Sequence, residues 1–372
     1  MKKFINEKAD INNPKWNNLI HREKEIYKRE NDLRSDFERD YNRILHSNAY
    51  KRMKHKTQVF FSPTSDHICT RMEHVSHVDS ISYTISNTLG LNTELTKAIS
   101  IGHDLGHAPF GHQGERILSE ISKKYIGDSF WHEKNGVNIV DNIELLEDWN
   151  SNFENMNLTY AVRDGIISHC GEIDENCIKP RNGYIDLNNY TYPNQYSPYT
   201  WEGCVVKISD KISYIIRDIE DAIYLHIIDN HLDELYDLLK YDRAQKINNS
   251  NIINTLIYDI CSNSSPENGL RFSDENLKLL NDIKKFNYEH IYNLANTKEA
   301  LEFYKVCINS VYDYFLKDLK SNNRESKIFK VFLNKMNNEY LSNNYSKIVI
   351  DFIAGMTDDY LLKTYNEIEN KK

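Results

Sequence analysis

The chain has 372 residues and a formal net charge of −9, with 27% charged and 40% hydrophobic residues. This length can bury a substantial core, either as one large domain or as a core with an appended part. The negative net charge excludes a positive electrostatic potential over the whole molecule. Single-stranded nucleic acid stays possible as a partner, but the net charge does not support it.

The sequence contains no recognisable targeting or membrane segment. The start, Met1-Lys2-Lys3-Phe4, runs into polar residues without the apolar region of a secretory signal. No stretch of about 18 apolar residues is present, so no membrane span is expected. The six cysteines lack Cys-x-x-Cys spacing, which argues against a zinc ribbon or disulfide framework and fits a reducing compartment. We therefore expect a cytoplasmic protein without a membrane partner.

Residues 1–30 are expected to form a polar lead-in, and the first long helix follows them. Ser35-Asp36-Phe37-Glu38 has the pattern of a capping box, and apolar residues at mostly helical spacing continue to about Lys56. The segment from Lys51 to Lys56 is basic. It could contact a polyanion, but a solvated helix face is the simpler explanation.

Two further helices lead to a stretch of unusual composition. Thr70-Arg71-Met72-Glu73 predicts a second capping box, and the helix behind it is expected to end at Gly90. A helix from about Thr93 to Gly102 then places His103 and Asp104 at its C-terminal end.

The segment from Ile101 to Glu115 contains three histidines, two carboxylates and four glycines. Glycine at this density breaks regular structure and lets the backbone approach a ligand closely. Nine of the fourteen histidines lie between His46 and His132, and imidazole is the commonest metal ligand. We interpret the segment as the floor of a metal-dependent active site.

The rest of the chain is predicted to be mainly helical. Residues 170–200 have no helical period and are expected to form an irregular insert, with a small hairpin near Asn182-Gly183. One long helix is predicted from Trp201 to about Ile228. The predicted fold class is all-α with few short strands: a lead-in over 1–30, a catalytic core over 31–230 and a helical C-terminal part over 231–372.

Residues of metal-ligand type recur in a particular order: His74 in the first turn of a helix, His103-Asp104 at a helix end, and Asp210 within the long helix. Two imidazoles and two carboxylates suit Mn²⁺, Fe²⁺, Co²⁺, Ni²⁺ or Zn²⁺, and suit Mg²⁺ alone less naturally. A lone helical histidine is more often a capping or core residue. The metal prediction therefore rests on the joint pattern.

This pattern resembles the deoxyguanosinetriphosphate triphosphohydrolase family of HD-domain phosphohydrolases. The most specific matching segment runs from His103 to Glu115 and reads HDLGHAPFGHQGE, and Thr70–His74 precedes it. Further matches, of which the one near the C-terminal end is weaker, extend the resemblance over roughly residues 34–360. They are Arg34–Asp40, Arg43–Ser47, Lys56–Phe60, Phe130–Gly136, Asp164–His169, Asp210–Tyr214 with Arg217-Asp218, and Asp351–Asp358.

The resemblance implies an all-α HD core and metal-dependent hydrolysis of a deoxynucleoside triphosphate to deoxynucleoside and inorganic triphosphate. Glu115 would orient His112, which would act as base or proton donor, and His107 would act as an acid or stabilise charge. His132 matches a histidine that only some members have. The implied metal ligands are His74, His103, Asp104 and Asp210, and the implied catalytic residues are His107, His112, Glu115 and His132. The metal would be Mn, Fe, Co or Mg.

The resemblance also implies a substrate pocket. Arg71 and Lys211 resemble triphosphate contacts, and Gln58, Tyr214 and Asp218 resemble a sugar pocket in which the tyrosine ring excludes a 2′-hydroxyl. Asp210, Tyr214 and Asp218 are spaced i, i+4, i+8 and share one helix face. A purely structural explanation stays open, with Tyr214 in the core and Asp218 paired to Arg217 or Lys211.

Two other functions remain open alongside this one. Another HD phosphohydrolase, such as a 5′-nucleotidase or a cyclic-nucleotide phosphodiesterase, would share the metal ligands. A nucleotide-sensing or nucleic-acid-binding protein would use the metal structurally. The family resemblance also implies a homo-oligomer, a tetramer or hexamer, and leaves open the choice between dGTP and all four dNTPs.

Overall fold

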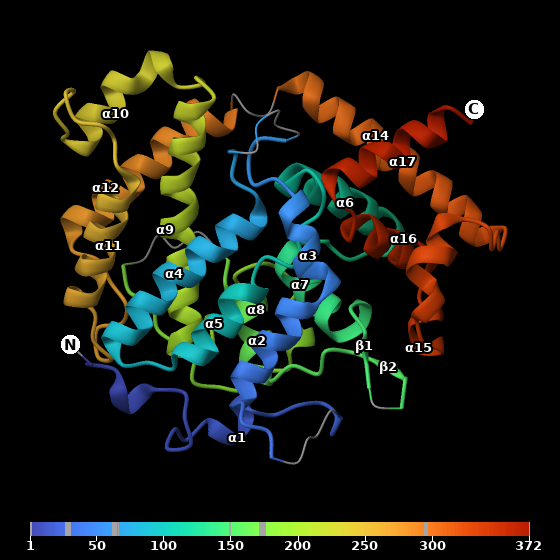
Figure 1. The fold of residues 1–372 in the computed structure, drawn as a ribbon, viewed down its shortest axis with the longest axis horizontal. Helices are drawn as coiled ribbons and strands as arrows, with labels where there is room; N and C mark the ends of the chain where they lie inside the picture. Colours follow the sequence, from blue (N-terminus) through green and yellow to red (C-terminus); the bar gives the residue numbers. More distant parts are fainter. Residues whose placement is uncertain are drawn as a thin grey trace.

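The computed structural model describes residues 2–26, 31–61, 65, 67–148, 150–170, 176–293 and 297–371. Helices dominate this part of the chain. Its only named strands are β1 (Leu146–Glu147) and β2 (Phe153–Glu154), a short antiparallel pair. The all-α prediction is therefore confirmed (Figure 1). None of the helices in these ranges is both long and apolar enough to cross a membrane.

A group of helices around α5 forms the centre of the molecule. α5 packs against α2, α4, α8 and α9, and α7 packs on α8. The bounds are α2 (Asp36–His46), α4 (Arg71–Leu89), α5 (Thr93–Gly102), α7 (His132–Asn138), α8 (Tyr160–Ser168) and α9 (Trp201–Tyr224). α7 continues into a π-helical turn, η3 (Ile139–Ile143).

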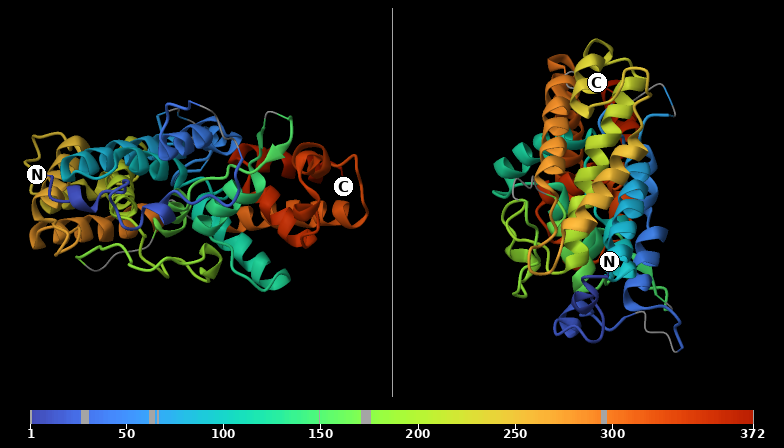
Figure 2. Two further views of the ribbon diagram at one scale, coloured as in Figure 1. Left: turned by 90° about the horizontal axis from the view of Figure 1, so that it is seen from below. Right: turned by 90° about the vertical axis from the view of Figure 1, so that its left-hand side faces the viewer.

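The chain after residue 230 forms two helical groups at opposite ends of an elongated molecule (Figure 2). At one end, α11 and α12 pack against α9, and α10 packs on α12. At the other end, α14 and α16 pack against α6, and α17 packs on α14. The bounds are α6 (Gly111–Tyr125), α10 (Leu232–Leu239), α11 (Asn249–Asn263), α12 (Asp274–Asn287), α14 (Lys298–Lys320), α16 (Tyr345–Ala354) and α17 (Asp358–Glu369). The domain boundaries at residues 30 and 230 stay predictions.

Shorter elements connect these groups. The N-terminal segment contains η1 (Ile5–Glu7) and α1 (Trp16–Leu19), and η4 (Leu187–Asn189) lies before α9. η5 (Asp229–His231) precedes α10, and a π-helical turn, η6 (Tyr288–Tyr292), continues α12. η7 (Ile328–Phe332), η8 (Leu333–Lys335) and α15 (Asn338–Leu341) lie between α14 and α16.

Three clusters of buried apolar side chains stabilise the fold. One joins α4 and α9 to α10–α12, the second lies among α2, α5, α7 and α8, and the third joins α6 to α14, α16 and α17. Ile85, Ile99 and Phe315 are almost fully buried examples, one from each cluster. Burial of such a side chain contributes about 1.5–3 kcal/mol. The segment from His103 to Glu115 lies between the second and third clusters.

The predicted helix starts are largely correct. Thr70 and Glu73 form a complete capping box at α4, and Gly90 ends that helix with φ of 89°. The Ser35 side chain accepts a hydrogen bond from the Glu38 amide at α2. These caps fix the first turns in which Arg71 and His74 lie.

Three helix and loop predictions were wrong in detail. The single helix predicted from Ser35 to Lys56 is interrupted at Ser47, which caps the next helix by accepting from the Tyr50 amide. The pieces after the break are α3 (Asn48–Arg52) and η2 (Met53–His55). α9 ends at Tyr224, four residues before the predicted end. No hairpin forms near Asn182, because the described part of this insert pairs instead through a bridge between Ile178 and Leu270.

Candidate active site

The predicted metal ligands converge from three helices at the centre of the fold. His74 lies in the first turn of α4, His103 and Asp104 follow α5, and Asp210 lies on α9. The His74 Nε2 atom lies 2.9 Å from Asp210 Oδ1, and His103 Nε2 lies 3.8 Å from the same oxygen. His103 Nε2 is 3.9 Å from Asp104 Oδ1. These separations bring all four residues around one small volume.

The orientation of His103 suits a metal ligand. Its Nδ1 donates to the Ser100 carbonyl at 2.6 Å, which leaves the Nε2 lone pair directed at the carboxylates. This Nε2 atom is buried and makes no hydrogen bond within the described residues. Burial lowers the pKa of His103 and favours the neutral ring that a metal requires.

His169 is a site residue that the sequence analysis did not assign. It lies directly after α8, and its ring centroid is 4.9 Å from that of His103. Its Nδ1 donates to the Ile166 carbonyl at 2.7 Å, as the corresponding atom of His103 does to Ser100. Burial lowers the pKa of His169 to about 3, so the ring is neutral. The available signal was its position at the end of the matching Asp164–His169 segment.

Asp104 joins the metal group to the neighbouring residues. Its Oδ2 accepts from Arg71 at 2.9 Å, and its Oδ1 lies 2.9 Å from His107 Nε2. Burial opposes ionisation of Asp104, but His107 and Arg71 together hold its pKa well below the usual range. Arg71, which was predicted to contact triphosphate, is therefore buried and bonded to a predicted metal ligand.

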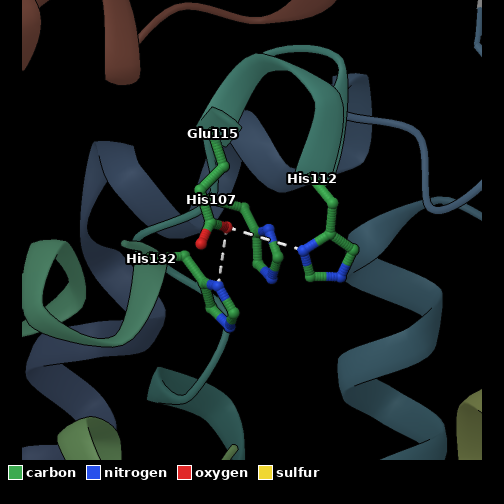
Figure 3. Close-up of side chains that lie close together, drawn as sticks. All are labelled: His107, His112, Glu115 and His132. Carbon is green, nitrogen blue, oxygen red and sulfur yellow. Dashed lines mark hydrogen bonds and ion pairs between the residues drawn. The ribbon is translucent and has the colours of Figure 1, made fainter. Parts of the chain in front are cut away.

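The four predicted catalytic residues form a second group (Figure 3). Glu115 lies between two histidines: its Oε2 is 2.9 Å from His132 Nδ1 and 3.5 Å from His112 Nδ1. The rings of His107 and His132 stack with centroids 3.8 Å apart. The structure therefore brings His132 into the group and makes it a closer partner of Glu115 than His112 is.

The charges of this group are set by burial and by neighbouring carboxylates. Burial opposes protonation of His132, yet Glu133 and Glu115 raise its pKa well above the usual range. Burial and the guanidinium of Arg71 lower the pKa of His107. His112, by contrast, has a side chain that is 66% exposed. The group thus combines a buried cation, a neutral ring and one ring that solvent can reach.

Two glycines allow the close packing of this segment. A Cβ on Gly106 would lie 1.9 Å from the His132 carbonyl oxygen, and a Cβ on Gly114 would lie 1.8 Å from the Pro109 carbonyl oxygen. Real Cβ atoms do not approach backbone this closely, so only glycine fits. The Gly106 contact brings the loop after α5 against the start of α7, where His132 lies.

The C-terminal helices hold the same loop from outside. Lys56 Nζ donates to the His107 carbonyl and, at 2.9 Å, to the Ala354 carbonyl. Asp358, at the start of α17, accepts from the Phe110 amide at 2.9 Å. Its other oxygen accepts from the Thr57 hydroxyl at 2.7 Å. The matching tail segment therefore has a structural role beside the site, which its sequence alone did not reveal.

Asp218, one of the predicted sugar-pocket residues, is a buried carboxylic acid. Asp218 Oδ2 accepts a hydrogen bond of 2.6 Å from the Tyr292 hydroxyl, and burial raises the pKa of Asp218 to about 7. Tyr214, one helical turn before Asp218, is half-buried. Tyr292, on η6, is a second residue that the sequence analysis missed, because nothing in its surroundings repeats a recognisable pattern.

Lys211 and Gln58 are the other residues predicted to contact the substrate. Lys211 is buried on α9, next to Asp210. Gln58 lies between η2 and α4, and its buried Oε1 makes no hydrogen bond within the described residues. No hydrogen bond among the described residues joins Gln58 to Asp218, so its place in a sugar pocket stays a prediction.

Comparison with known proteins supports the same interpretation. Residues 71–215 match the HD domain family, and residues 270–367 match the phosphohydrolase-associated domain family. The deoxyguanosinetriphosphate triphosphohydrolase-like protein of Caldanaerobacter subterraneus subsp. tengcongensis is 35% identical over 76% of this chain and 73% of the relative. Proteins with the same description from Desulfatibacillum aliphaticivorans and Clostridium tetani are 32% and 33% identical, over 77% and 79% of this chain and 75% and 76% of their own lengths.

Proposed function

Because the chain belongs to the deoxyguanosinetriphosphate triphosphohydrolase-like family of HD-domain proteins, we propose that it hydrolyses deoxynucleoside triphosphates to deoxynucleoside and inorganic triphosphate. One observation carries the proposal. A group of metal-ligand type and a group suited to proton transfer lie side by side, joined by the 2.9 Å contact between Asp104 and His107. Phosphoryl hydrolysis needs both kinds of group at one phosphorus atom.

The ligand group fits a divalent metal, for which we propose Mn²⁺, Fe²⁺, Co²⁺ or Mg²⁺. His74, His103, Asp104 and Asp210 would hold it, and the unbonded Nε2 of buried His103 supports this assignment. When bound, such an ion supplies positive charge that polarises the α-phosphate and makes water more acidic.

In the proposed reaction the oxygen of a water molecule attacks the α-phosphorus, and the bond from phosphorus to the 5′ oxygen breaks. The water loses a proton, for which the neutral ring of His107 offers its Nδ1 atom, because Nε2 is engaged by Asp104. This role as a base replaces the acid or charge-stabilising role that the family resemblance implies for His107. The 5′ oxygen leaves with the electron pair and takes a proton. His112 suits this step, because its ring is exposed and its Nδ1 lies 3.5 Å from Glu115 Oε2.

The buried cation of His132 has a different role in the proposal. Its ring stacks on His107 and its Nδ1 contacts Glu115, so it reaches both reacting histidines. A fixed positive charge at this position would counter the charge that develops on the phosphate oxygens.

Recognition of the deoxyribose is assigned to the face of α9 that carries Tyr214 and Asp218. Asp218 already accepts from Tyr292, and its remaining oxygen could accept from a 3′-hydroxyl. The Tyr214 ring would occupy the space of a 2′-hydroxyl. Arg71 and Lys211 would supply cationic contacts for the triphosphate.

A product assay tests the proposed function. The full chain is incubated with each of the four dNTPs and with GTP, in the presence of Mn²⁺, Mg²⁺ or Co²⁺, and the products are separated by chromatography. Intact triphosphate from a dNTP, with little turnover of GTP, is the expected result. A nucleoside monophosphate with pyrophosphate, or released orthophosphate, would favour another HD phosphohydrolase. Binding without turnover would favour a nucleotide sensor.

We also propose a cytoplasmic homo-oligomer, a tetramer or hexamer. The family supports oligomer formation, and Phe303 and Val306 on α14 are 47% and 49% exposed, which leaves apolar surface for a subunit contact. Light scattering on the purified chain measures the assembly size directly.

A further inference from the structure

A second cluster of metal-ligand side chains lies away from the active site, where η5 and α10 meet η6. His231 is the last residue of η5, and Glu234 lies in the first turn of α10. His290 lies in the middle of η6, the π-helical turn that continues α12. The helices α10 and α12 that bring these residues together pack against each other (Figure 1).

The distances within this cluster match those between ligands of one ion. His290 Nε2 lies 3.2 Å from Glu234 Oε2, and His231 Nδ1 lies 3.8 Å from the same oxygen. One ligand atom from each residue lies within 4.8 Å of the others. Zinc bonds of about 2.0–2.1 Å at tetrahedral angles place two ligand atoms about 3.3–3.4 Å apart. The distance between His290 and Glu234 is close to this spacing, and the side chain of His231 would have to move closer to Glu234 to complete it.

The Nε2 atom of His290 is available as a ligand. Within the described residues this buried atom makes no hydrogen bond, although a carboxylate oxygen lies only 3.2 Å away. A nitrogen and an oxygen that approach closely without hydrogen-bond alignment can both point at a third atom. A buried polar atom without a partner destabilises the folded chain. A bound cation would remove that destabilisation.

The packing around His290 restricts its ring to this orientation. One side stacks on His231 with ring centroids 3.9 Å apart and planes 26° apart. Another side packs against Phe286, whose ring centroid is 4.8 Å away. Glu234, by contrast, has a side chain that is 55% exposed, which leaves a path from solvent. The cluster thus combines a fixed ligand with an open entrance.

A nearby pair shows what an ordinary surface contact looks like in the same segment. His226 and Asp229 have the same i, i+3 spacing as His231 and Glu234. Their side chains are 80% and 50% exposed, and His226 Nδ1 contacts Asp229 Oδ2 in a hydrogen bond of 3.0 Å. Among the described residues that pair has no third ligand and no buried, unbonded nitrogen. It therefore serves as an internal control.

We propose that His231, Glu234 and His290 bind a second divalent metal ion of the zinc type, separate from the active-site metal. Two imidazoles and one carboxylate form a ligand set that Zn²⁺ and Co²⁺ accept, with water at the remaining position. The ion fastens η5 and α10 to η6. His290 lies two residues before Tyr292, so the ion also steadies the turn whose tyrosine contacts Asp218.

Zinc stoichiometry tests this site on the full chain. Protein stripped with a chelator is equilibrated with Zn²⁺ at a low micromolar free concentration, and the bound zinc per chain is measured by mass spectrometry. The variants are Glu234→Gln, which changes an exposed side chain, and His290→Ala, with His226→Ala as the matched control. Each of the first two is expected to bind one zinc ion fewer per chain than the wild type, and His226→Ala the same number.

Thermal unfolding with and without Zn²⁺ provides a second measurement. An ion that binds only the native chain raises the Tm. In an Asp210→Asn background, which weakens the active-site metal, Zn²⁺ should still raise the Tm, and Glu234→Gln should remove most of that rise. Equal zinc content in the wild type, Glu234→Gln and His290→Ala would overturn the proposal. The cluster would then be two stacked histidines beside a carboxylate that bind no metal. Neither result depends on which reaction the protein catalyses.

Discussion

Asp104 is the residue that connects the two parts of the active site. One of its oxygens accepts from Arg71, and the other lies 2.9 Å from His107 Nε2. A charge change at Asp104 would therefore alter both the metal group and the protonation of His107. The four residues His107, His112, Glu115 and His132 are one step further from the metal group, so substitutions there should separate metal binding from catalysis.

Glu115→Gln tests that separation. The amide keeps the size of Glu115 but removes the charge that raises the pKa of His132 and contacts His112, so we expect turnover to fall by about 10²–10⁴-fold. Metal content, measured by mass spectrometry, should stay at the wild-type value. Asp210→Asn is the contrasting variant and should lose bound metal as well as activity. A Glu115→Gln protein that has lost its metal would contradict the assignment.

Asp218 should make stability depend on pH in a recognisable direction. Burial raises its pKa to about 7, so the folded chain holds a proton there that the unfolded chain releases near pH 4. Stability contributed by this proton is present at low pH and is lost as pH rises from about 4 to 7, by about 1.4 kcal/mol per pH unit.

Asp218→Asn removes this titration while keeping an oxygen that can accept from Tyr292. The wild type should therefore lose free energy of unfolding between pH 5 and pH 7, and the variant should lack this loss. The free energy of unfolding of the variant minus that of the wild type should increase from pH 5 to pH 7. Urea unfolding of both proteins at the two pH values, with metal removed, measures the difference. If the difference in free energy of unfolding between the two proteins is the same at pH 5 and pH 7, Asp218 titrates at an ordinary pKa.

At the scale of elements, the active site depends on how closely the loop after α5 approaches α7. Gly106→Ala would place a Cβ 1.9 Å from the His132 carbonyl oxygen, so the backbone must move. We expect a loss of about 1–3 kcal/mol in stability, seen as a lower Tm, together with reduced turnover. Gly183→Ala is the control, because nothing lies within 4 Å of its added Cβ. Equal Tm values for the two variants would contradict this packing argument.

The sequence predicted most elements well, because caps and helical periodicity are local properties. The complete capping box at Thr70 and the end at Gly90 illustrate this. The break at Ser47 was missed because Ile44 and Met53 continue an apolar pattern across it, and both are buried. Ser47 ends one helix and caps the next. Periodicity alone cannot distinguish a serine that caps a new helix from a serine inside a continuous helix.

At the scale of the whole molecule, the C-terminal helices act on the active-site loop through Asp358. This carboxylate accepts from the Phe110 amide, and Phe110 has φ of 60°, a conformation that needs support from outside the loop. Asp358→Ala should therefore lower the rate of turnover at least about tenfold, because misplacing reacting groups is costly. Kinetic assays measure kcat for the variant.

Asp359→Ala is the matched control for that experiment. Asp359 is the next residue in the first turn of α17 and is exposed, so its loss affects the helix end but not the loop. Bound metal should be unchanged in both variants. A similar kcat for Asp358→Ala and Asp359→Ala would show that the loop keeps its conformation without the C-terminal helices.

Long-range contacts are also where sequence reasoning reached its limit. His169 and Tyr292 were both missed. His169 ends a segment that matches the family but carries no ligand pattern of its own, and the surroundings of Tyr292 repeat no recognisable pattern. Lys56 lies 298 residues from Ala354, whose carbonyl it binds, and no local property predicts such a pair. The proposed metal ligands, by contrast, could be predicted from the sequence, because each lies at a defined place in a predicted helix or at its end. They are His74, His103, Asp104 and Asp210.

The distance in sequence between the metal ligands has a consequence for folding kinetics. His74 and Asp210 are 136 residues apart, and α5 must dock against both of their helices before all four ligands can meet. Helices form within microseconds, whereas contacts at long sequence separation must first overcome loop-closure entropy. During refolding, helical circular dichroism should therefore recover before metal affinity does. The active-site metal then serves as a reporter of the last docking step.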